Sequence, residues 1–163
     1  MDQIPLPQDF KDLLNLLHAH GVKHLLIGGW AVGFYGHPRN TADIDIWIAV
    51  DTKNFEAVIS MLKEFIGTAP AMDDFKKRPF QLRMGVPPNR VELITDISGV
   101  EFDQCFPNRV AGSMDGAPVT LIGLEDLLKN KRAAGRDKDI SDVKHLEKYH
   151  KLAAKGKADN PKP

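Results

Sequence analysis

Apolar residues recur along the chain at two spacings, one typical of helices and one typical of strands. Apolar side chains three and four positions apart form one face of an amphipathic helix. Helices are predicted at residues 8–20, 30–35, 53–66, 123–132 and 137–152. Short apolar or alternating runs predict strands at residues 22–27, 44–50, 80–84, 90–95, 109–111 and 119–122. This order of elements favours an α/β or α+β protein with a mixed central sheet flanked by helices.

The segments between these elements hold residues that end helices or form turns. A proline places residues 36–42 in a loop, and the GVPPN turn at 85–89 joins the strands on either side into a hairpin. Residues 67–78 are expected to be a loop, and residues 100–106 a strand that leads into a loop. Residues 153–163 are polar and interrupted by Gly and Pro, which predicts a disordered tail.

A chain of 163 residues, 42% of them hydrophobic, is long enough to bury a core and most simply forms one domain. We expect this domain to span residues 1–152, with a helical C-terminal part at 123–152. No apolar run is long enough to span a membrane, and the N-terminus lacks the pattern of a signal peptide. The single cysteine, Cys105, excludes an internal disulfide. These features predict a cytoplasmic protein without a membrane partner.

Charge is balanced over the whole chain but not along it. Residues 1–128 hold 11 Lys and Arg against 17 Asp and Glu, whereas residues 129–163 hold 11 against 5. An acidic body attracts divalent metal ions, and a basic C-terminal part suits contact with nucleic acid or nucleotide phosphates. A solvated helix with a disordered end is the alternative explanation of the basic part.

Gly28 and Gly29 stand between the strand at 22–27 and the helix at 30–35. Glycine lets a ligand approach the backbone closely, and free N–H groups at the start of a helix favour phosphate. The alternative is that the two glycines serve only the packing of a tight turn.

Asp43 and Asp45 are two positions apart at the entrance to the next strand, so both side chains point to one face. The two carboxylates repel each other unless a cation or donor groups lie between them, and oxygen ligands suit Mg²⁺. A solvated pair at a strand entrance is the alternative. The apolar run IDIWIAV favours a central strand, in which unpaired carboxylates are costly.

Gly-Gly, a spacer of thirteen residues and Asp-Ile-Asp, bracketed by two apolar strands, resemble the signature of the nucleotidyltransferase superfamily of the DNA polymerase β type. The resemblance covers residues 8–95. It implies a mixed sheet flanked by helices and a metal-dependent transfer of a nucleotidyl group from a nucleoside triphosphate. It also implies a third carboxylate on a later strand.

Glu92, in the strand RVELIT, stands where this superfamily usually has an aspartate. Glutamate can bind a metal, although its extra methylene moves the carboxylate oxygens outward. Asp96 is the second candidate, although it lies past the expected end of the strand. The structural alternative for Glu92 is an ion-paired strand residue.

A narrower resemblance, extending to about residue 147, is to the small bacterial nucleotidyltransferases related to AbiEii toxins and antibiotic nucleotidyltransferases. It rests on GHPRNTADIDI, RVELITDISGVEF and LEDLLKNKRAAGRDKDISDVKHLE. In that group a lysine, a Gly-Arg and two aspartates recur in the C-terminal helices; they correspond here to Lys131, Gly135, Arg136, Asp139 and Asp142. The resemblance implies a place in a toxin–antitoxin pair. We expect Arg136 to pair with Asp139 or Asp142 and to hold the last helix.

These resemblances and elementary electrostatics assign a role to each candidate residue. Asp43, Asp45 and Glu92 are expected to hold Mg²⁺, or Mn²⁺, and Glu92 to accept the proton of the acceptor hydroxyl. The residues expected to bind substrate are Gly28, Gly29, Arg39, Thr41 and Lys131. Two of these are cationic and would neutralise phosphate charge. The alternatives are a plain loop charge for the arginine and a solvated helix residue for the lysine.

The sequence therefore predicts a metal-dependent nucleotidyltransferase that moves a nucleoside monophosphate from a nucleoside triphosphate to a hydroxyl. The acceptor is an RNA end, a protein side chain or a small molecule. No large acceptor-binding domain is evident, so the C-terminal helices, a partner protein or a second copy of the chain would supply that surface. A non-catalytic protein of the same fold that binds a nucleotide or a partner is the alternative. A metal-dependent phosphohydrolase fits the carboxylates but not the glycine pair and its spacing.

Overall fold

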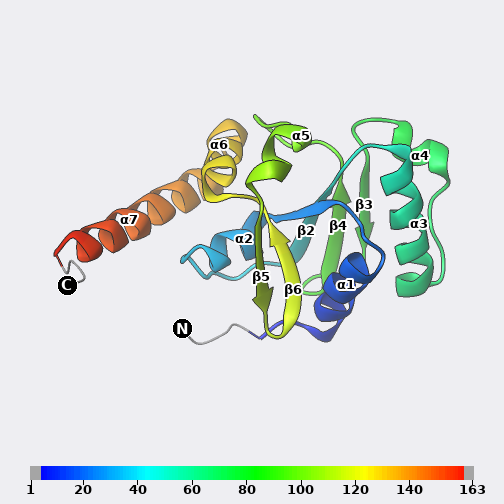
Figure 1. The fold of residues 1–163 in the computed structure, drawn as a ribbon, viewed down its shortest axis with the longest axis horizontal. Helices are drawn as coiled ribbons and strands as arrows, with labels where there is room; N and C mark the ends of the chain where they lie inside the picture. Colours follow the sequence, from blue (N-terminus) through cyan, green and yellow to red (C-terminus); the bar gives the residue numbers. More distant parts are fainter. Residues whose placement is uncertain (1–4, 160–163) are drawn as a thin grey trace.

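A six-stranded mixed sheet forms the centre of the computed structural model, which describes residues 5–159 and side chains up to residue 152 (Figure 1). The strand order is β3-β4-β2-β1-β6-β5. The strands are β1 (His24–Ile27), β2 (Asp43–Ile48), β3 (Gln81–Met84), β4 (Arg90–Ile94), β5 (Val110–Met114) and β6 (Ala117–Leu121). The predicted fold class is confirmed.

The directions of the strands bring segments that are distant in sequence side by side. β2 runs parallel to β4 and antiparallel to β1, so it lies between the two strands in the middle of the sheet. β1 in turn runs parallel to β6. Two antiparallel hairpins, β3–β4 and β5–β6, complete the two edges. The strand that carries the paired aspartates is therefore central.

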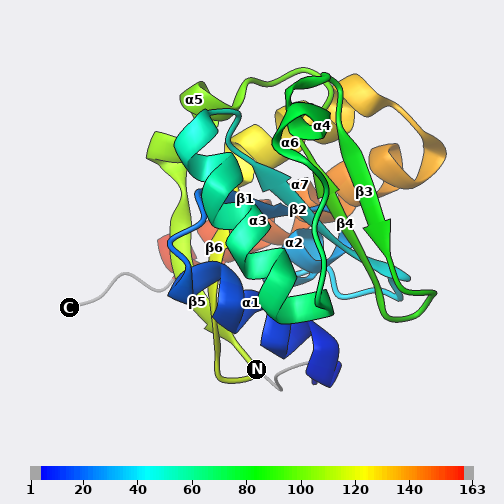
Figure 2. The ribbon, with the colours of Figure 1, turned by 90° about the vertical axis from the view of Figure 1, so that its right-hand side faces the viewer.

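Helices cover both faces of this sheet. They are α1 (Gln8–Ala19), α2 (Gly28–Phe34), α3 (Thr52–Ile66), α4 (Met72–Lys76), α5 (Phe102–Cys105), α6 (Leu124–Ala134) and α7 (Asp137–Asp159), with a short 3-10 turn at Phe106–Asn108. Figure 2 shows α1 and α3 in front of the sheet, with α2 and α7 behind it. None of the described helices is both long and apolar enough to cross a membrane.

The two central strands separate an apolar face from a polar one. Ile44 and Ile46 on β2, with Val91 and Leu93 on β4, are buried in the core. The residues between them are only half-buried, because alternate side chains of a strand point to opposite faces. The acidic side chains predicted for the site occur at these alternate positions. The core therefore fixes the face of the sheet on which they lie.

Local chemistry accounts for the best-predicted helix, α3. The side chain of Asp51 accepts a hydrogen bond from the backbone N–H of Asn54 at 2.8 Å, which caps the first turn. Gly67 ends the helix in the left-handed conformation, at φ +81°. Phe55 and Val58 bury one face of the helix in the core. The hydrophobic period, the N-cap at Asp51 and the glycine at position 67 therefore indicate the same helix bounds.

Two segments form a different element from the one predicted. Residues 67–78, expected to be a loop, contain α4, because Phe75 is buried between the rings of Phe55 and Phe80. The strand expected in 100–106 is instead α5, whose Phe102 packs edge-on against Trp47 at 5.2 Å between ring centroids. In both cases tertiary packing of one aromatic residue outweighs a weak local pattern.

Two further differences concern the ends of helices. α2 begins at Gly28 rather than at residue 30, so both glycines belong to its first turn. α7 continues past residue 152 to Asp159, within the tail expected to be disordered. Residues 160–163 of that tail lie outside the described residues.

Candidate functional site

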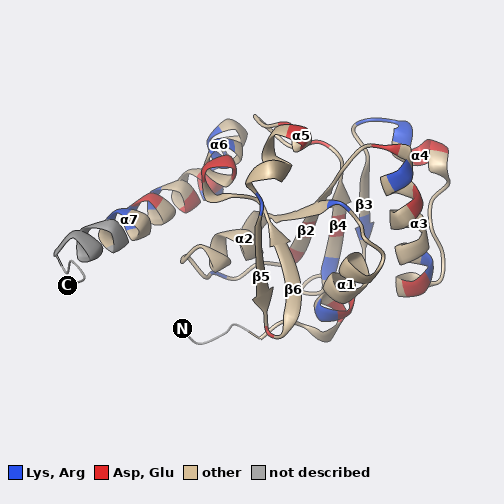
Figure 3. Cartoon of the chain, in the orientation of Figure 1, with Lys and Arg blue, Asp and Glu red and all other residues tan. Residues whose placement is uncertain are grey.

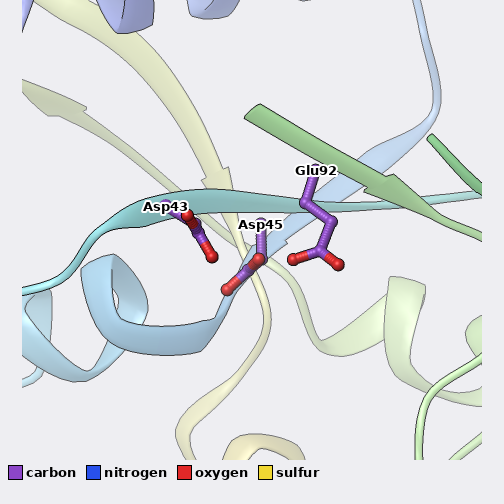
Figure 4. A group of neighbouring side chains, drawn as sticks. All are labelled: Asp43, Asp45 and Glu92. Atoms are coloured by element: carbon purple, nitrogen blue, oxygen red, sulfur yellow. The ribbon is translucent and has the colours of Figure 1, made fainter. Parts of the chain in front are cut away.

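Three acidic side chains converge on the polar face of the sheet. Asp43 and Asp45 lie two positions apart on β2, and Glu92 on β4 is the register partner of Asp45. One oxygen of each carboxylate lies within 4.8 Å of the other two (Figure 4). Asp96, the second candidate for the third carboxylate, instead pairs with Arg78. The structure therefore places Glu92 in the acidic cluster.

The acidic cluster makes the ionisation of Asp45 costly. Burial, followed by a hydrogen bond and charge repulsion from Glu92 and then repulsion from Asp43, raises the pKa of Asp45 to about 7. Lys131 acts in the opposite direction but does not offset these effects. A cation near the cluster would relieve the repulsion between its carboxylates.

The glycine pair is packed directly against this cluster. β1 is paired with β2 so that Ile27 is opposite Asp45, and Gly28 follows at once. A β-carbon at Gly28 would lie 2.2 Å from Oδ2 of Asp45, and the residue has a φ of +71°. A β-carbon at Gly29 would lie 2.8 Å from Oγ1 of Thr41. Glycine at position 28 lets the backbone approach the acidic cluster closely, and glycine at position 29 lets it approach Thr41.

The donor set and the glycine cradle fit a hard divalent cation. Carboxylate oxygens are the ligands that Mg²⁺ and Mn²⁺ prefer, and Mg²⁺ is commonly bound by one or two carboxylates together with substrate phosphates. The close approach at Gly28 leaves no room for a side chain beside Asp45. The arrangement can therefore bring the phosphates of a ligand next to a carboxylate-bound cation.

All eight residues predicted for the site line one cavity of about 780 Å³ between the sheet and the C-terminal helices. They are Gly28, Gly29, Arg39, Thr41, Asp43, Asp45, Glu92 and Lys131. The volume suits a nucleotide-sized ligand. The hydroxyl of Thr41 donates to the backbone carbonyl of Asp43 at 3.1 Å, which ties the loop before β2 to the start of that strand.

Lys131 is buried rather than solvated. It is only 4% exposed, and its Nζ lies 3.2 Å from a carboxylate oxygen of both Asp139 and Asp142 on α7. Arg39 donates from Nε and Nη2 to the two oxygens of Asp142, each at 2.8 Å. The alternative of a plain loop charge is thus wrong for Arg39. Both cations lie on the cavity wall, but both are held there by acids of the last helix.

Arg136 extends the same network, as expected. Its Nε donates to Oδ2 of Asp139 at 2.7 Å, so this aspartate lies between two cations. Figure 3 shows acidic positions at the start of α6 and basic positions towards its end, with both signs interspersed along the described part of α7. The network attaches the helical C-terminal part to the loop that carries Arg39.

Sequence reasoning missed two arginines of the site. Arg90 on β4 donates to both oxygens of Asp43, at 2.8 and 2.9 Å, and Arg83 on β3 donates to Oε1 of Glu92 at 3.1 Å. Both arginines line the cavity. Strand alternation carries a signal for Arg90, because it lies two positions before Glu92 and so shares its face. Nothing local identifies Arg83, whose position depends on the register of the hairpin.

Residues 7–160 match the family described as nucleotidyl transferase of unknown function, DUF2204, and the chain belongs to this family. This membership confirms the superfamily. The narrower relation to AbiEii toxins and antibiotic nucleotidyltransferases stays a prediction.

The fold is also similar to a solved structure, that of an antigenic nucleotidyltransferase-like protein from Paracoccidioides brasiliensis. The TM-score is 0.50 at 21% sequence identity, and the match covers 88% of this chain and 78% of the other. At this level of identity the likeness concerns the fold alone. No curated protein matches the sequence.

Proposed function

We propose that this protein is a divalent-metal-dependent nucleotidyltransferase that moves a nucleoside monophosphate from a nucleoside triphosphate to a hydroxyl. One observation carries the proposal: the carboxylates of Asp43, Asp45 and Glu92 converge beside a glycine pair that has no room for a side chain. This arrangement provides oxygen ligands for a cation and a close backbone approach for phosphates. Membership of a nucleotidyl transferase family supports it.

The residues of the site would have separate roles in this reaction. Asp43, Asp45 and Glu92 would hold the metal, which when bound offsets phosphate charge and polarises the oxygen that attacks. The backbone of Gly28 and Gly29 would accommodate the triphosphate. Glu92, which lines the cavity, would accept the proton of the acceptor hydroxyl. Transfer then releases pyrophosphate, which must leave through the same cavity.

Three classes of acceptor fit the proposed transfer. An RNA end, a protein side chain and a small molecule all present a hydroxyl. The C-terminal helices border the cavity through Asn130, Ala134 and Lys138, so an acceptor would enter beside them. We expect a small acceptor, or one brought by a partner protein or a second copy of the chain.

A labelling experiment tests the proposal. The protein is incubated with each α-³²P nucleoside triphosphate, Mg²⁺ or Mn²⁺, and separate pools of RNA, protein and small metabolites. We expect label in one pool with wild type and none with the double variant Asp43→Asn/Asp45→Asn, which removes charge without changing shape. Asp96→Asn, which changes a carboxylate outside the cavity, is the matched control and should keep full transfer.

The alternative, a protein that binds a nucleotide without transferring it, has one observation in its favour. Arg90 and Arg83 already pair with two of the three carboxylates, as they would in a permanently neutralised site. Saturable nucleotide binding without label in any pool would favour this alternative. Release of phosphate from simple esters without a nucleotide would instead favour a phosphohydrolase.

A further inference from the structure

Two arginines hold the acidic cluster where a metal ion would be expected to act. The guanidinium of Arg90 covers both oxygens of Asp43, with Nε and Nη2 at 2.8 and 2.9 Å. Arg83 reaches one oxygen of Glu92 at 3.1 Å. In both cases the arginine is the direct register partner of the acid on the neighbouring strand. The backbone itself therefore places each cation next to its carboxylate.

These pairs are partly open to the cavity. The side chain of Arg90 is 29% exposed and that of Arg83 is 59% exposed, whereas the carboxylates beneath them are 20% and 12% exposed. Because both arginine side chains are partly exposed and line the cavity, each can turn away from its acid without entering the packed core. The acids, by contrast, are fixed on two central strands.

The arginines and a metal ion would compete for the same oxygens. A carboxylate oxygen of Asp43 that binds a cation must loosen at least one of its two hydrogen bonds to Arg90. Displaced guanidinium groups need a new acceptor, and a phosphate group offers oxygens in the bidentate geometry that arginine favours. A triphosphate brought in with the metal supplies that acceptor within the same cavity.

We propose that Arg83 and Arg90 are exchangeable counter-ions, which neutralise the acidic cluster before substrate binds and turn to the triphosphate when a metal–nucleotide complex enters. This inference rests on the proposed function for its class of substrate. It makes the two arginines substrate-binding residues. It also has a thermodynamic consequence: free metal binds weakly because it must displace the arginines, whereas a metal–polyphosphate complex binds well because it engages them.

The opposite possibility is that the arginines are permanent structural partners. Arg78 and Asp96 form such a pair at the end of the sheet, outside the cavity. Removing either kind of arginine takes a positive charge away from the carboxylates, so free metal would bind more tightly in both cases. A permanent partner does not engage the polyphosphate, so its removal would also tighten binding of the metal–polyphosphate complex. The two possibilities thus predict opposite signs for the effect of removing an arginine on the affinity for the metal–polyphosphate complex.

Titration with Mn²⁺, followed by the electron paramagnetic resonance signal of the free ion, measures that sign without any transfer reaction. The proteins are wild type, Arg90→Gln, Arg83→Gln and the matched control Arg78→Gln. Each is titrated with Mn²⁺ alone and then with Mn²⁺ and inorganic tripolyphosphate. Arg90→Lys, which keeps the charge but not the two-pronged hydrogen bonding, serves as a second variant if Arg90→Gln does not fold.

We expect Arg90→Gln to bind Mn²⁺ alone about threefold or more tightly than wild type, and to bind the tripolyphosphate complex about tenfold less tightly. Arg83→Gln should shift both affinities in the same directions but by less, because it has one hydrogen bond to lose. Arg90→Lys should lie between wild type and Arg90→Gln. Arg78→Gln should leave both affinities within about twofold of wild type.

The inference would be overturned if both Arg90→Gln and Arg90→Lys bound Mn²⁺ alone no more tightly than wild type, or if they bound the tripolyphosphate complex as tightly as wild type or more tightly. That result would leave the proposed function standing if label transfer is seen. Opposite shifts in the two titrations without transfer of label to any acceptor would support the inference and count against the proposed reaction. Mn²⁺ binding that is identical in wild type and Asp43→Asn/Asp45→Asn would overturn both.

Discussion

At the scale of single residues, Gly28 sets the distance between the backbone of α2 and the acidic cluster. Its φ of +71° is open to glycine at little cost, and its neighbour across the turn is the carboxylate of Asp45. Gly21 has a similar φ of +62°, but a β-carbon there would meet no atom within 4 Å. A substitution at Gly21 therefore measures only the cost of the backbone conformation. A substitution at Gly28 adds the cost of a collision with Asp45.

We predict that Gly28→Ala lowers the affinity for Mn²⁺ by about tenfold or more, because the added methyl group displaces the carboxylate of Asp45. Gly21→Ala should lose only about 1 kcal/mol of unfolding free energy, the cost of a left-handed alanine, with no change in metal affinity. Urea unfolding and Mn²⁺ titration of both variants provide the measurement. Equal metal affinities in the two variants would show that the contact with Asp45 has no bearing on the site.

The carboxyl group of Asp45 links the site to pH. Since its folded pKa is raised to about 7, the folded state binds a proton that the unfolded state has already released. Its contribution to stability is complete below the ordinary aspartate pKa and is lost as pH rises towards 7.

We predict that, without metal, the unfolding free energy of wild type minus that of Asp45→Asn falls by on the order of 3 kcal/mol between about pH 4 and pH 7. Subtracting the variant cancels the histidines, which titrate in the same range. Asp96→Asn is the control: Arg78 lowers the pKa of Asp96, so its contribution is constant over this range and is lost only in acid. A pH-independent difference for Asp45→Asn would contradict the raised pKa.

At the scale of elements, a buried ion-pair network joins α6 and α7 to the loop before β2. Asp142 is 1% exposed and accepts hydrogen bonds from Arg39, while Lys131 lies on its other side. Burial opposes the ionisation of Asp142, but Arg39 and Lys131 outweigh it and lower its pKa. An exposed pair, Arg132 with Glu147, links the same two helices at their surface.

We predict that Asp142→Asn lowers the free energy of unfolding by about 3 kcal/mol, because it leaves two cations around a site that no longer carries a charge. Glu147→Gln, the same change in the exposed pair, should cost less than about 1 kcal/mol. Denaturant unfolding of both variants at neutral pH distinguishes them. Similar losses in the two would mean that the buried network is not what holds the C-terminal helices.

At the scale of the whole molecule, the cavity lies between the sheet and the C-terminal helices, so a ligand in it contacts both. The glycines, the acidic cluster and Lys131 come from four different elements of the fold, namely α2, β2, β4 and α6. A ligand that binds only when these elements are assembled stabilises the folded state by mass action.

We predict that Mg²⁺ with a non-hydrolysable nucleoside triphosphate, at about a hundredfold its Kd, raises the free energy of unfolding by about 2.7 kcal/mol. Thermal unfolding with and without the ligand measures the effect. Asp43→Asn/Asp45→Asn should remove the stabilisation and Asp96→Asn should retain it. Equal stabilisation of all three proteins would place the nucleotide outside this cavity.

The tertiary structure also explains where local prediction failed. Residues 67–78 and 100–106 carry no strong hydrophobic period, and their helices form because Phe75 and Phe102 find aromatic partners on other elements. The local sequence is compatible with a solvated helix residue at Lys131, yet this lysine is buried and forms ion pairs with two aspartates of α7. Long-range contacts of this kind leave no trace in a local pattern.

The sequence by itself determined the class of fold, the central strand and the two halves of the candidate site at Gly28-Gly29 and Asp43–Asp45. It did so because hydrophobic period, glycine placement and the spacing of carboxylates on a strand are local properties. Only the tertiary structure decided that Glu92, rather than Asp96, joins the acidic cluster, and that Arg83 and Arg90 are paired with it. Those facts depend on the register between strands, which is set by the packing of the whole sheet.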